Sequence, residues 1–442
     1  MGEVKIDGAA FPHSMSAHAL KAARKAIEQA RAGTNAIMEQ LRESIDSGDA
    51  IAQKEILAGL PTNKEVLLTC AIAANKTLKP KKRQSLESCL EAANILSFEK
   101  PLSEIVPVYP KPKSGGGVRM IHDHGLHHRT GQNLVQRCLS PFFKPRSFQY
   151  TFRGVHAAVF EVRMRLRMGY VCIGRYDIKS FYGSFDHREL SFALPVPKSL
   201  VDHVAVGRHM KVKMKDVSRW GKSFSHPLPY ETHLLSAARQ GIPHGSTCSP
   251  LVSSYCMSQL QWHPEPELVL VNYADDFLLM GRSMAVLQNA GSVLVEAVGD
   301  LPGGHFELHC KCTVEAKKGF NFLGHQFRLL DGCVEVSPTQ ENIEHFWKRL
   351  AELDERASKL VYSLELPKKE AFPLAVEALA RLAAFVQGWR AAFSACDNPD
   401  RWLGIAQEEI AKYRKKLGIS SRQLKASIDP SMIGPEDWYF YP

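Results

Sequence analysis

The stretch LVLVNYADDFLLM (268–280) consists of two apolar runs that meet at a pair of carboxylates, Asp275 and Asp276. A second apolar run, VCIGRYDI (171–178), carries Asp177 just before its end. Runs of β-branched and aromatic residues of this length predict buried strands. We therefore expect adjacent strands, with one aspartate at the end of the first and two aspartates in a hairpin turn beside it.

Three carboxylates in this arrangement suit hard divalent cations, because Mg²⁺ prefers oxygen ligands and keeps positions open for phosphates. Polymerases need two such cations roughly 3.5–4 Å apart, one at the primer hydroxyl and one at the triphosphate. Each motif also has a plain structural explanation, since an Asp-Asp pair commonly forms a turn and an aspartate at a strand end commonly caps a helix. The surrounding motifs decide between the two interpretations.

Five further segments accompany these carboxylates. They are KSGGGVRMIHDHGLHHRTGQNLVQ (113–136), TFRGVHAAV (151–159), RYDIKSFYGSFDH (175–187), RQGIPHGSTCSPLVSSY (239–255) and GFNFLGHQF (319–327). Together with the YADD box (273–276), they resemble the motifs of bacterial reverse transcriptases of the group II intron and retron type, in the same order. The resemblance extends over roughly residues 100–330, and an ordered set is far more specific than any single motif.

The resemblance implies an α+β fold, a right-hand polymerase with a ferredoxin-like palm, fingers and a helical thumb. We expect a helical N-terminal extension at 1–100, fingers and palm at 101–335, and a helical thumb with a C-terminal tail at 336–442. The segment FVQGWRAAF (385–393) is similar to the thumb of group II intron enzymes, and we expect Trp389 to lie in its core. A helical thumb would hold a duplex through its shape and its phosphates.

The resemblance also implies a role for each matching residue. Asp177 and Asp275 would be the principal metal ligands, helped by the backbone carbonyl of Ile178. Asp276 would lie close to the primer end as a further catalytic and metal-binding residue. The residues expected to contact the incoming nucleotide are Lys111, Arg119, Tyr182, Gly241, Pro243 and His244, and those of the primer grip are Phe322, Leu323 and Gly324.

Four of these roles follow from chemistry that suits the residue type. The guanidinium of Arg119 would hold the triphosphate through two parallel hydrogen bonds. Lys111 would contact the triphosphate or the nucleic-acid backbone, unless it is simply solvated. The ring of Tyr182, five residues after Asp177, would exclude a 2′ hydroxyl and so favour deoxynucleotides. Gly241 would let the backbone approach the nucleotide closely.

Two positions depart from the family pattern. His244 stands where the family usually has glutamine, so the nucleotide contact there is expected to differ or to depend on pH. In ELHCKCTV (307–314), Cys312 stands where a lysine precedes threonine. Lys311, one position earlier, is the candidate substitute, and a lysine general acid is in question.

Composition places limits on the class of protein. A net charge of +10 over 442 residues suits a polyanionic partner. Ten cysteines without a CxxC pair indicate reduced thiols and a cytoplasmic location. The start MGEVKIDGAAFPHS lacks the apolar core of a signal peptide, and no uncharged apolar run reaches the roughly 18 residues of a membrane helix, so no membrane partner is expected.

The pattern predicts the following local structure. Ser16 caps a helix through AHALKAARKAIEQARAG with Gly33 as its stop, and helices follow around 35–47 and 85–96. EIVPVY and VRMI form a hairpin with a cationic tip, and the chain after Pro338 is helical to about residue 416.

Two polar segments leave alternatives open. The cluster His122, His124, His127 and His128 invites a zinc site but lacks the spacing of a known ligand set, so we expect polar surface or an RNA contact. The basic segment 207–224 is either a contact for the template or a dedicated RNA, or a solvated insertion.

The leading hypothesis is RNA-directed DNA synthesis with Mg²⁺, or Mn²⁺ in its place, from deoxynucleoside triphosphates to a DNA product. A structured non-coding RNA is the expected template, and antiviral defence against phage is the expected setting, because no endonuclease module for intron mobility follows the thumb. The alternatives are a domesticated group II intron or retron-like enzyme, template-independent DNA synthesis, and a non-catalytic RNA-binding protein of maturase type. The oligomeric state stays open.

Overall fold

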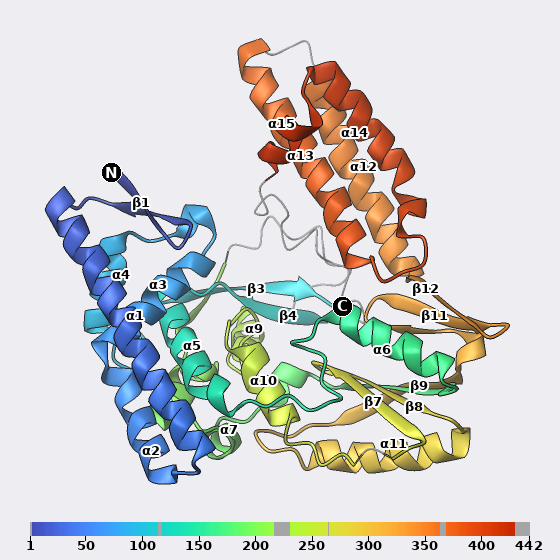
Figure 1. Cartoon of the computed structure of the whole chain (residues 1–442), viewed down its shortest axis with the longest axis horizontal. Coiled ribbons are helices and arrows are strands. Elements are labelled where there is room, and N and C mark those ends of the chain that lie inside the picture. Colours follow the sequence, from blue (N-terminus) through green and yellow to red (C-terminus); the bar gives the residue numbers. More distant parts are fainter. Residues whose placement is uncertain (1, 114–116, 216–229, 264, 363–367, 429–442) are drawn as a thin grey trace. The chain divides into compact units, whose positions relative to one another are not determined.

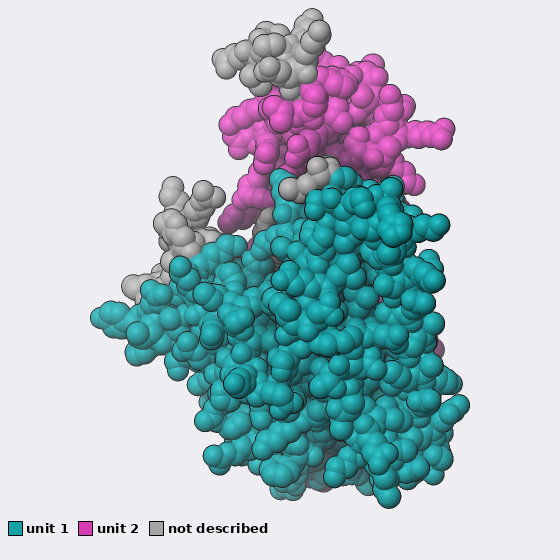
Figure 2. All heavy atoms as spheres, turned by 90° about the vertical axis from the view of Figure 1, so that its left-hand side faces the viewer, with its two compact units in different colours: residues 1–149, 178–263, 293–309 teal, residues 150–177, 264–292, 310–442 magenta. Residues whose placement is uncertain are grey.

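The computed structural model describes residues 2–113, 117–215, 230–263, 265–362 and 368–428 (Figure 1). The chain divides into two compact units, coloured separately in Figure 2. Unit 1 comprises Met1–Gln149, Ile178–His263 and Val293–His309, and unit 2 comprises Tyr150–Asp177, Pro264–Ser292 and Cys310–Pro442. The predicted domain boundaries at residues 100 and 335 stay predictions.

Unit 1 begins with a β-hairpin that the sequence analysis missed. Its strands are β1 (Gly2–Ile6) and β2 (Ala9–His13), which pair antiparallel. The two-residue turn is Asp7-Gly8, with φ of +49° and +78°. An Asp-Gly pair readily adopts the positive φ that a tight hairpin turn needs, so the signal for this turn was present.

The helices of the N-terminal extension are α1 (Ala17–Asp46), α2 (Ala50–Gly59), α3 (Lys64–Thr77) and α4 (Leu86–Ile95). Ser16 caps α1, as predicted, by accepting a hydrogen bond from the backbone N–H of Ala19. The predicted stop at Gly33 is wrong, because α1 continues through it. A Cβ at Gly33 would come within 1.9 Å of a carboxylate oxygen of Glu65 on α3, so this glycine makes room for a neighbouring helix.

The predicted hairpin at residues 104–121 is confirmed within unit 1. Its strands are β3 (Val106–Pro112) and β4 (Val118–His122), and β6 (Val212–Met214) pairs parallel with β3 at the other side. The described part of the basic segment thus contributes an edge strand, while 216–224 lies outside the described residues. The remaining longer helices of this unit are α5 (Leu126–Leu139), α7 (His187–Ala193), α9 (Glu231–Ala238) and α10 (Ser249–Met257).

The central sheet has the strand order β7-β8-β5-β9. Its strands are β5 (Cys172–Ile178), β7 (Leu268–Tyr273), β8 (Asp276–Gly281) and β9 (Leu308–Glu315). Helix α10 intervenes in the chain between β5 and β7, and α11 (Met284–Gly299) connects β8 to β9. In chain order these elements alternate as β-α-β-β-α-β, which is the ferredoxin-like arrangement predicted for the palm.

Two helices cover this sheet on opposite faces (Figure 1). Helix α6 (Val155–Arg167) buries Ala158, Val159 and Val162 in one core with Ile173 of β5. On the other face, Gly291 of α11 admits the Tyr176 side chain, since a Cβ there would come within 2.2 Å of the tyrosine hydroxyl. The odd-numbered residues of β5, Asp177 among them, therefore face away from α11.

The rest of unit 2 is a small sheet and a helical bundle, so the predicted helical thumb is confirmed. The sheet is β10 (Phe320–Phe322), β11 (His325–Leu330) and β12 (Cys333–Pro338). The helices are α12 (Gln340–Tyr362), α13 (Lys368–Ala392), α14 (Gly404–Leu417) and α15 (Ser421–Ser427). Trp389 is fully buried against Phe346 and Phe393, as expected for a core residue.

No single helix among the described residues has the length and apolar character to cross a membrane. One pair, Ala50–Thr62 with Lys64–Thr77, meets that criterion only when both are counted together, and it is bent by 65°.

Candidate active site

The register of the central sheet gathers the predicted carboxylates. Strands β5 and β8 pair antiparallel with Asp177 opposite Asp276, and β7 and β8 pair with Tyr273 opposite Asp276. Ala274 and Asp275 therefore form the two-residue turn of the β7–β8 hairpin. The prediction of one aspartate at a strand end and two at a neighbouring hairpin turn is confirmed.

The hairpin turn is held in an unusual backbone conformation. Ala274 has a φ of +51°, which side chains other than glycine adopt at a cost. Its N–H donates to Thr151 Oγ1 at 2.9 Å, and the buried Asn272 amide donates to the carbonyls of Ala274 at 2.9 Å and Asp276 at 3.3 Å. Thr151 and Asn272 thus fix the loop that presents Asp275.

The carboxylates repel one another because like charges are held close together in a partly buried site. Burial, together with the nearby Asp275 and Asp177 carboxylates, raises the pKa of Asp276 to about 6, against the opposing effect of Arg175. Arg175 Nη2 lies 3.6 Å from Asp276 Oδ1, a long contact for an ion pair. The site therefore holds excess negative charge that an additional cation would stabilise.

The structure places Lys311, and not Cys312, beside the carboxylates. Lys311 Nζ lies 2.9 Å from Asp177 Oδ2, whereas Cys310 acts on the Tyr176 hydroxyl and helps to raise its pKa to about 12, after the larger effect of burial. Successive residues of a strand face opposite sides of a sheet. Lys311 is therefore on the carboxylate face of β9, and Cys312 shares the opposite face with Cys310.

The three carboxylates suit a divalent cation in their chemistry. All are hard oxygen donors, and the repulsion that raises the pKa of Asp276 is what a bound cation would relieve. In the described residues, however, no three His, Cys, Asp or Glu side chains are already gathered as a ligand set. A cation bound at Asp177 would share this carboxylate with the Lys311 ammonium or compete with it.

The predicted nucleotide contacts lie in unit 1, and two of them touch. The Tyr182 and His244 rings stack with centroids 4.7 Å apart and an interplanar angle of 21°. The Ile242 N–H donates to the Tyr182 carbonyl at 2.9 Å. Gly241 has a φ of +58°, and a Cβ there would come within 1.9 Å of the same carbonyl, so only glycine fits at this position.

The predicted phosphate-binding cations lie on the β3–β4 hairpin. Lys111 and Arg119 are directly opposite each other in the register, which puts two like charges on one face. Such a pair is destabilising unless an anion lies between them.

The pKa of His244 is lowered to about 3 by burial and then by the charges of Arg119, His122 and Lys113. Arg119 and Lys113 therefore lie within electrostatic reach of the loop that carries Pro243 and His244.

The predicted primer grip is the β10–β11 turn. Leu323 and Gly324 form a two-residue turn with φ of +48° and +73°. The Phe322 and Leu323 side chains are buried in the core of unit 2, and the Gly324 carbonyl accepts from the Asn342 amide at 2.9 Å. A role in holding a primer would fall to the turn backbone and stays a prediction.

The histidine cluster is mainly interior, so the expectation of polar surface is wrong for three of its members. His122, His124 and His128 are buried, and His127 is half-buried. Both ring nitrogens of His122 contact backbone carbonyls, Nδ1 that of His244 at 3.1 Å and Nε2 that of Ala238 at 2.8 Å, which does not suit a shared ion. His128 Nδ1 lies 2.8 Å from a Glu104 oxygen.

Glu104 explains why two of these histidines stand where they do. Its carboxylate accepts from the backbone N–H groups of His127 at 3.3 Å and His128 at 2.9 Å, at the start of α5. Gly125, the residue before α5, has no side chain to cap the helix, and a Cβ there would come within 2.3 Å of Glu104. A distant glutamate thus replaces the local cap.

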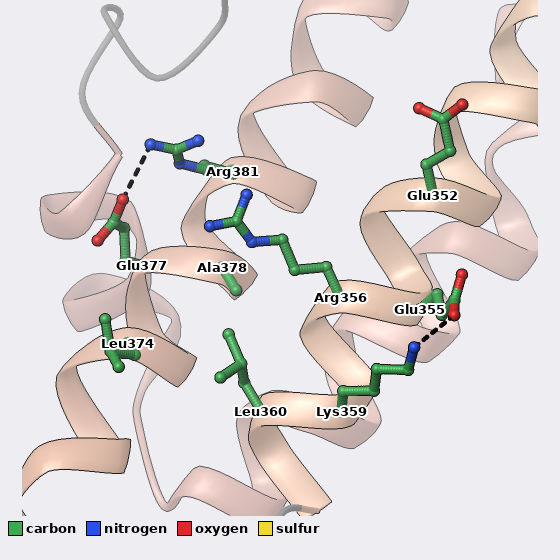
Figure 3. Close-up of a pocket in the computed structure, with 9 residues that line it drawn as sticks. All are labelled: Glu352, Glu355, Arg356, Lys359, Leu360, Leu374, Glu377, Ala378 and Arg381. Atoms are coloured by element: carbon green, nitrogen blue, oxygen red, sulfur yellow. Dashed lines mark hydrogen bonds and ion pairs between the residues drawn. The ribbon is translucent and has the colours of Figure 1, made fainter. Parts of the chain in front are cut away.

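A groove of about 510 Å³ lies in the thumb between α12 and α13 (Figure 3). Its charged lining is largely paired along each helix, as in Glu355 with Lys359 at 2.7 Å and Glu377 with Arg381 at 2.9 Å. None of the predicted site residues lines it. The chemistry is therefore assigned to the carboxylate sheet and not to this groove.

Sequence reasoning missed Thr151, Asn272, Arg175 and Glu104. A signal existed for Asn272 and Arg175, which are polar residues inside the otherwise apolar runs VLVNY and VCIGRYDI. Burying such side chains is costly unless a contact requires them. No local signal marks Glu104 as a cap, because its partners lie more than 20 residues away.

Comparison with known proteins gives a match to one family model. Residues 110–327 match the model described as reverse transcriptase (RNA-dependent DNA polymerase). A bacterial relative, Protein YkfC of Escherichia coli (strain K12), is 23% identical over 266 residues, covering 49% of this chain and 64% of the relative. The chain thus spans less than two thirds of that relative.

Two solved structures are among those similar to this chain. Telomerase from Candida albicans, in complex with a fragment of telomeric RNA, is 13% identical with a TM-score of 0.33, over 77% of this chain and 64% of that one. The 3Dpol RNA-dependent RNA polymerase of a sicinivirus is 10% identical with a TM-score of 0.32, over 74% and 69%.

Proposed function

We propose that this chain is an RNA-directed DNA polymerase, because residues 110–327 match the family model described as reverse transcriptase. The observation that carries the proposal is the register of the central sheet, which sets Asp177 opposite Asp276 with Asp275 in the adjoining turn. The proposed substrates are an RNA template and deoxynucleoside triphosphates, and the proposed product is DNA.

In the proposed mechanism, Asp177, Asp275 and the Ile178 carbonyl would hold Mg²⁺, or Mn²⁺ in its place. When bound, two such cations would activate the primer hydroxyl and neutralise the triphosphate. Thr151 and Asn272 hold the turn so that Asp275 is preorganised. Lys311 Nζ lies 2.9 Å from Asp177 Oδ2, so an ammonium would be close to the reacting groups.

Substrate binding is proposed for the cations of unit 1. Lys111 and Arg119 lie opposite each other on one face of the β3–β4 hairpin, a spacing that suits the oxygens of one triphosphate. Tyr182 would discriminate against the 2′ hydroxyl. Tyr182 follows Asp177 by five residues, so the extended chain can separate their Cα atoms by at most about 18 Å.

The test is primer extension on an RNA template with purified protein, Mg²⁺ and all four deoxynucleotides. We expect a product complementary to the template from the wild type and none above background from Asp177→Asn. Products of a sequence unrelated to any template would favour template-independent synthesis. RNA binding without any synthesis would favour a maturase-type RNA-binding protein.

We further propose a dedicated structured RNA as the template and phage defence as the setting. Residues 1–109 lie outside the family match and add a helical surface to the domain. The edge strand β6 and its flanks expose Lys211, Lys213 and Lys215, which suit phosphates. A cytoplasmic location is proposed as well, on the cysteine pattern of the sequence.

Two measurements test this setting. Sequencing of the RNA and DNA that co-purify with the protein should return one RNA and its complementary DNA. Phage plated on cells with the native locus should form fewer plaques than on cells with Asp275 and Asp276 replaced by alanine. Equal plaque numbers over a broad phage panel would favour a domesticated intron or retron-like enzyme.

A further inference from the structure

The ring of Tyr182 has a stacking partner that the family pattern does not supply. His244 occupies the position where that pattern has glutamine, and its ring stacks on Tyr182 at 4.7 Å and 21°. An aromatic ring gains from such an offset stack in a way that an aliphatic amide does not. Tyr182 is half-buried, so the stack is one of the contacts that restrict its ring.

His244 is itself anchored through its backbone. The His122 N–H donates to the His244 carbonyl at 2.9 Å, and Ile121 forms a parallel β-bridge with His244. A Cβ at Gly245 would come within 2.5 Å of the His122 carbonyl, so the loop lies directly on β4. The imidazole therefore projects from a backbone position that cannot shift easily.

The backbone of Tyr182 is fixed by the same loop, which leaves its ring as the adjustable part. The Ile242 N–H donates to the Tyr182 carbonyl, and Gly241 fits against that carbonyl without space for a side chain. With both backbones held, the side-chain rotation of Tyr182 is the remaining freedom. The imidazole of His244 limits that rotation.

The charge state of His244 argues against a role as a phosphate ligand. Burial and the neighbouring positive charges of Arg119, His122 and Lys113 lower its pKa to about 3. The ring is therefore neutral near pH 7, and its contact with Tyr182 is a stack between two neutral rings.

We propose that His244 is a positioning residue that holds the Tyr182 ring in place and thereby sets how strongly deoxynucleotides are preferred to ribonucleotides. This inference rests on the proposed polymerase function. An aromatic pair contributes modestly, so loss of the stack should reduce the preference by about three- to tenfold, less than loss of the Tyr182 ring itself.

The experiment compares kcat/KM for one deoxynucleotide and its ribonucleotide in the wild type, His244→Ala, His244→Gln and His244→Phe. We expect the alanine and glutamine variants to lose preference, mainly through better use of the ribonucleotide, while phenylalanine restores it. His233→Ala is the matched control, because it removes an exposed tyrosine–histidine ring contact with Tyr230 in the same unit. It should leave the preference unchanged.

A double-mutant cycle separates positioning from a second, independent contact. If His244 acts through Tyr182, the variant Tyr182→Ala with His244→Ala should show the same preference as Tyr182→Ala alone. Additive losses, or an unchanged preference in His244→Ala, would overturn the inference while leaving the polymerase intact.

If the proposed polymerase function is wrong, the wild type will extend no primer. Competition between dATP and ATP for binding in the presence of Ca²⁺ then decides the inference without catalysis. Weaker selectivity in His244→Ala than in the wild type supports it, and equal selectivity overturns it. Circular dichroism of each variant verifies folding, and the phenylalanine variant keeps an aromatic ring at this position.

Discussion

Two largely buried carboxylates, one in each unit, have opposite properties. In unit 2, burial and its acidic neighbours raise the pKa of Asp276 to about 6. In unit 1, burial alone would raise the pKa of Glu104, but hydrogen bonds from His128 and His127 and the charge of His128 hold it below its ordinary value. Asp276 faces two other carboxylates and is opposed only in part by Arg175, whereas Glu104 accepts several hydrogen bonds.

The difference separates a residue that is poised for a ligand from one that builds the fold. Glu104 is satisfied by protein groups and caps a helix, so it contributes stability. Asp276 repels its neighbours and lowers stability until something cationic binds. A residue that the fold tolerates at a cost is a candidate for function.

The largest expected effect tests the carboxylate side of this comparison. Replacing Asp275 and Asp276 together by alanine should abolish DNA synthesis, because the cations lose their ligands, while RNA affinity is largely kept by distant lysines and arginines. Glu315→Ala removes a half-buried glutamate on β9 that pairs with Lys317; it is the matched control and should remain active. Undiminished synthesis by the double variant in a primer-extension assay would disprove the assignment.

The next effect concerns selection by unit 1. Tyr182→Ala should weaken discrimination against ribonucleotides by on the order of a hundredfold in relative kcat/KM, since the clash with a 2′ hydroxyl disappears. Tyr182→Phe keeps the ring and should behave like the wild type. The same preference in the wild type and the alanine variant would place the discriminating contact elsewhere.

The free energy of unfolding should increase when the charge of Asp276 is removed. A pKa raised from 3.8 to about 6 corresponds to a cost of about 3 kcal/mol at pH values above both. Asp276→Asn should therefore unfold at a higher denaturant concentration than the wild type at pH 7.5 without divalent cations. As the pH falls through 6 towards 4, the folded wild type takes up a proton first, and the advantage of the variant should vanish.

The opposite sign is expected at the helix cap, with a smaller effect. Glu104→Gln should lower the free energy of unfolding by about 1–3 kcal/mol at pH 7, because charge-assisted hydrogen bonds are lost. The contribution of Glu104 is fully present above its unfolded pKa near 4.5 and is lost as the pH falls through its lowered folded value. The deficit of the variant should thus shrink in acid. If the Asp276 and Glu104 variants shift the free energy of unfolding in the same direction at pH 7, the two carboxylates do not differ in their effect on stability.

Much of the carboxylate site was predictable because its signals are local. An apolar run predicts each strand, and the aspartates stand where these runs end or turn. The ring pair of unit 1 was predictable only in part. Tyr182 and His244 were both expected at the nucleotide, but their stacking joins positions 62 residues apart, and no pattern within either segment indicates it.

By itself, the sequence determined the secondary structure of the palm, its order along the chain and the three carboxylates, because alternation and turn chemistry act over a few residues. Only the tertiary structure decided the partner of each polar group. Because Lys311 and Cys312 lie on opposite faces of edge strand β9, only Lys311 contacts Asp177. The packing of α5 brings the backbone N–H and the ring of His128 to Glu104, which caps the helix. The role of a side chain as a ligand, a helix cap or a positioning residue depends on the groups that packing brings within about 3 Å of it. Those groups come from distant parts of the chain.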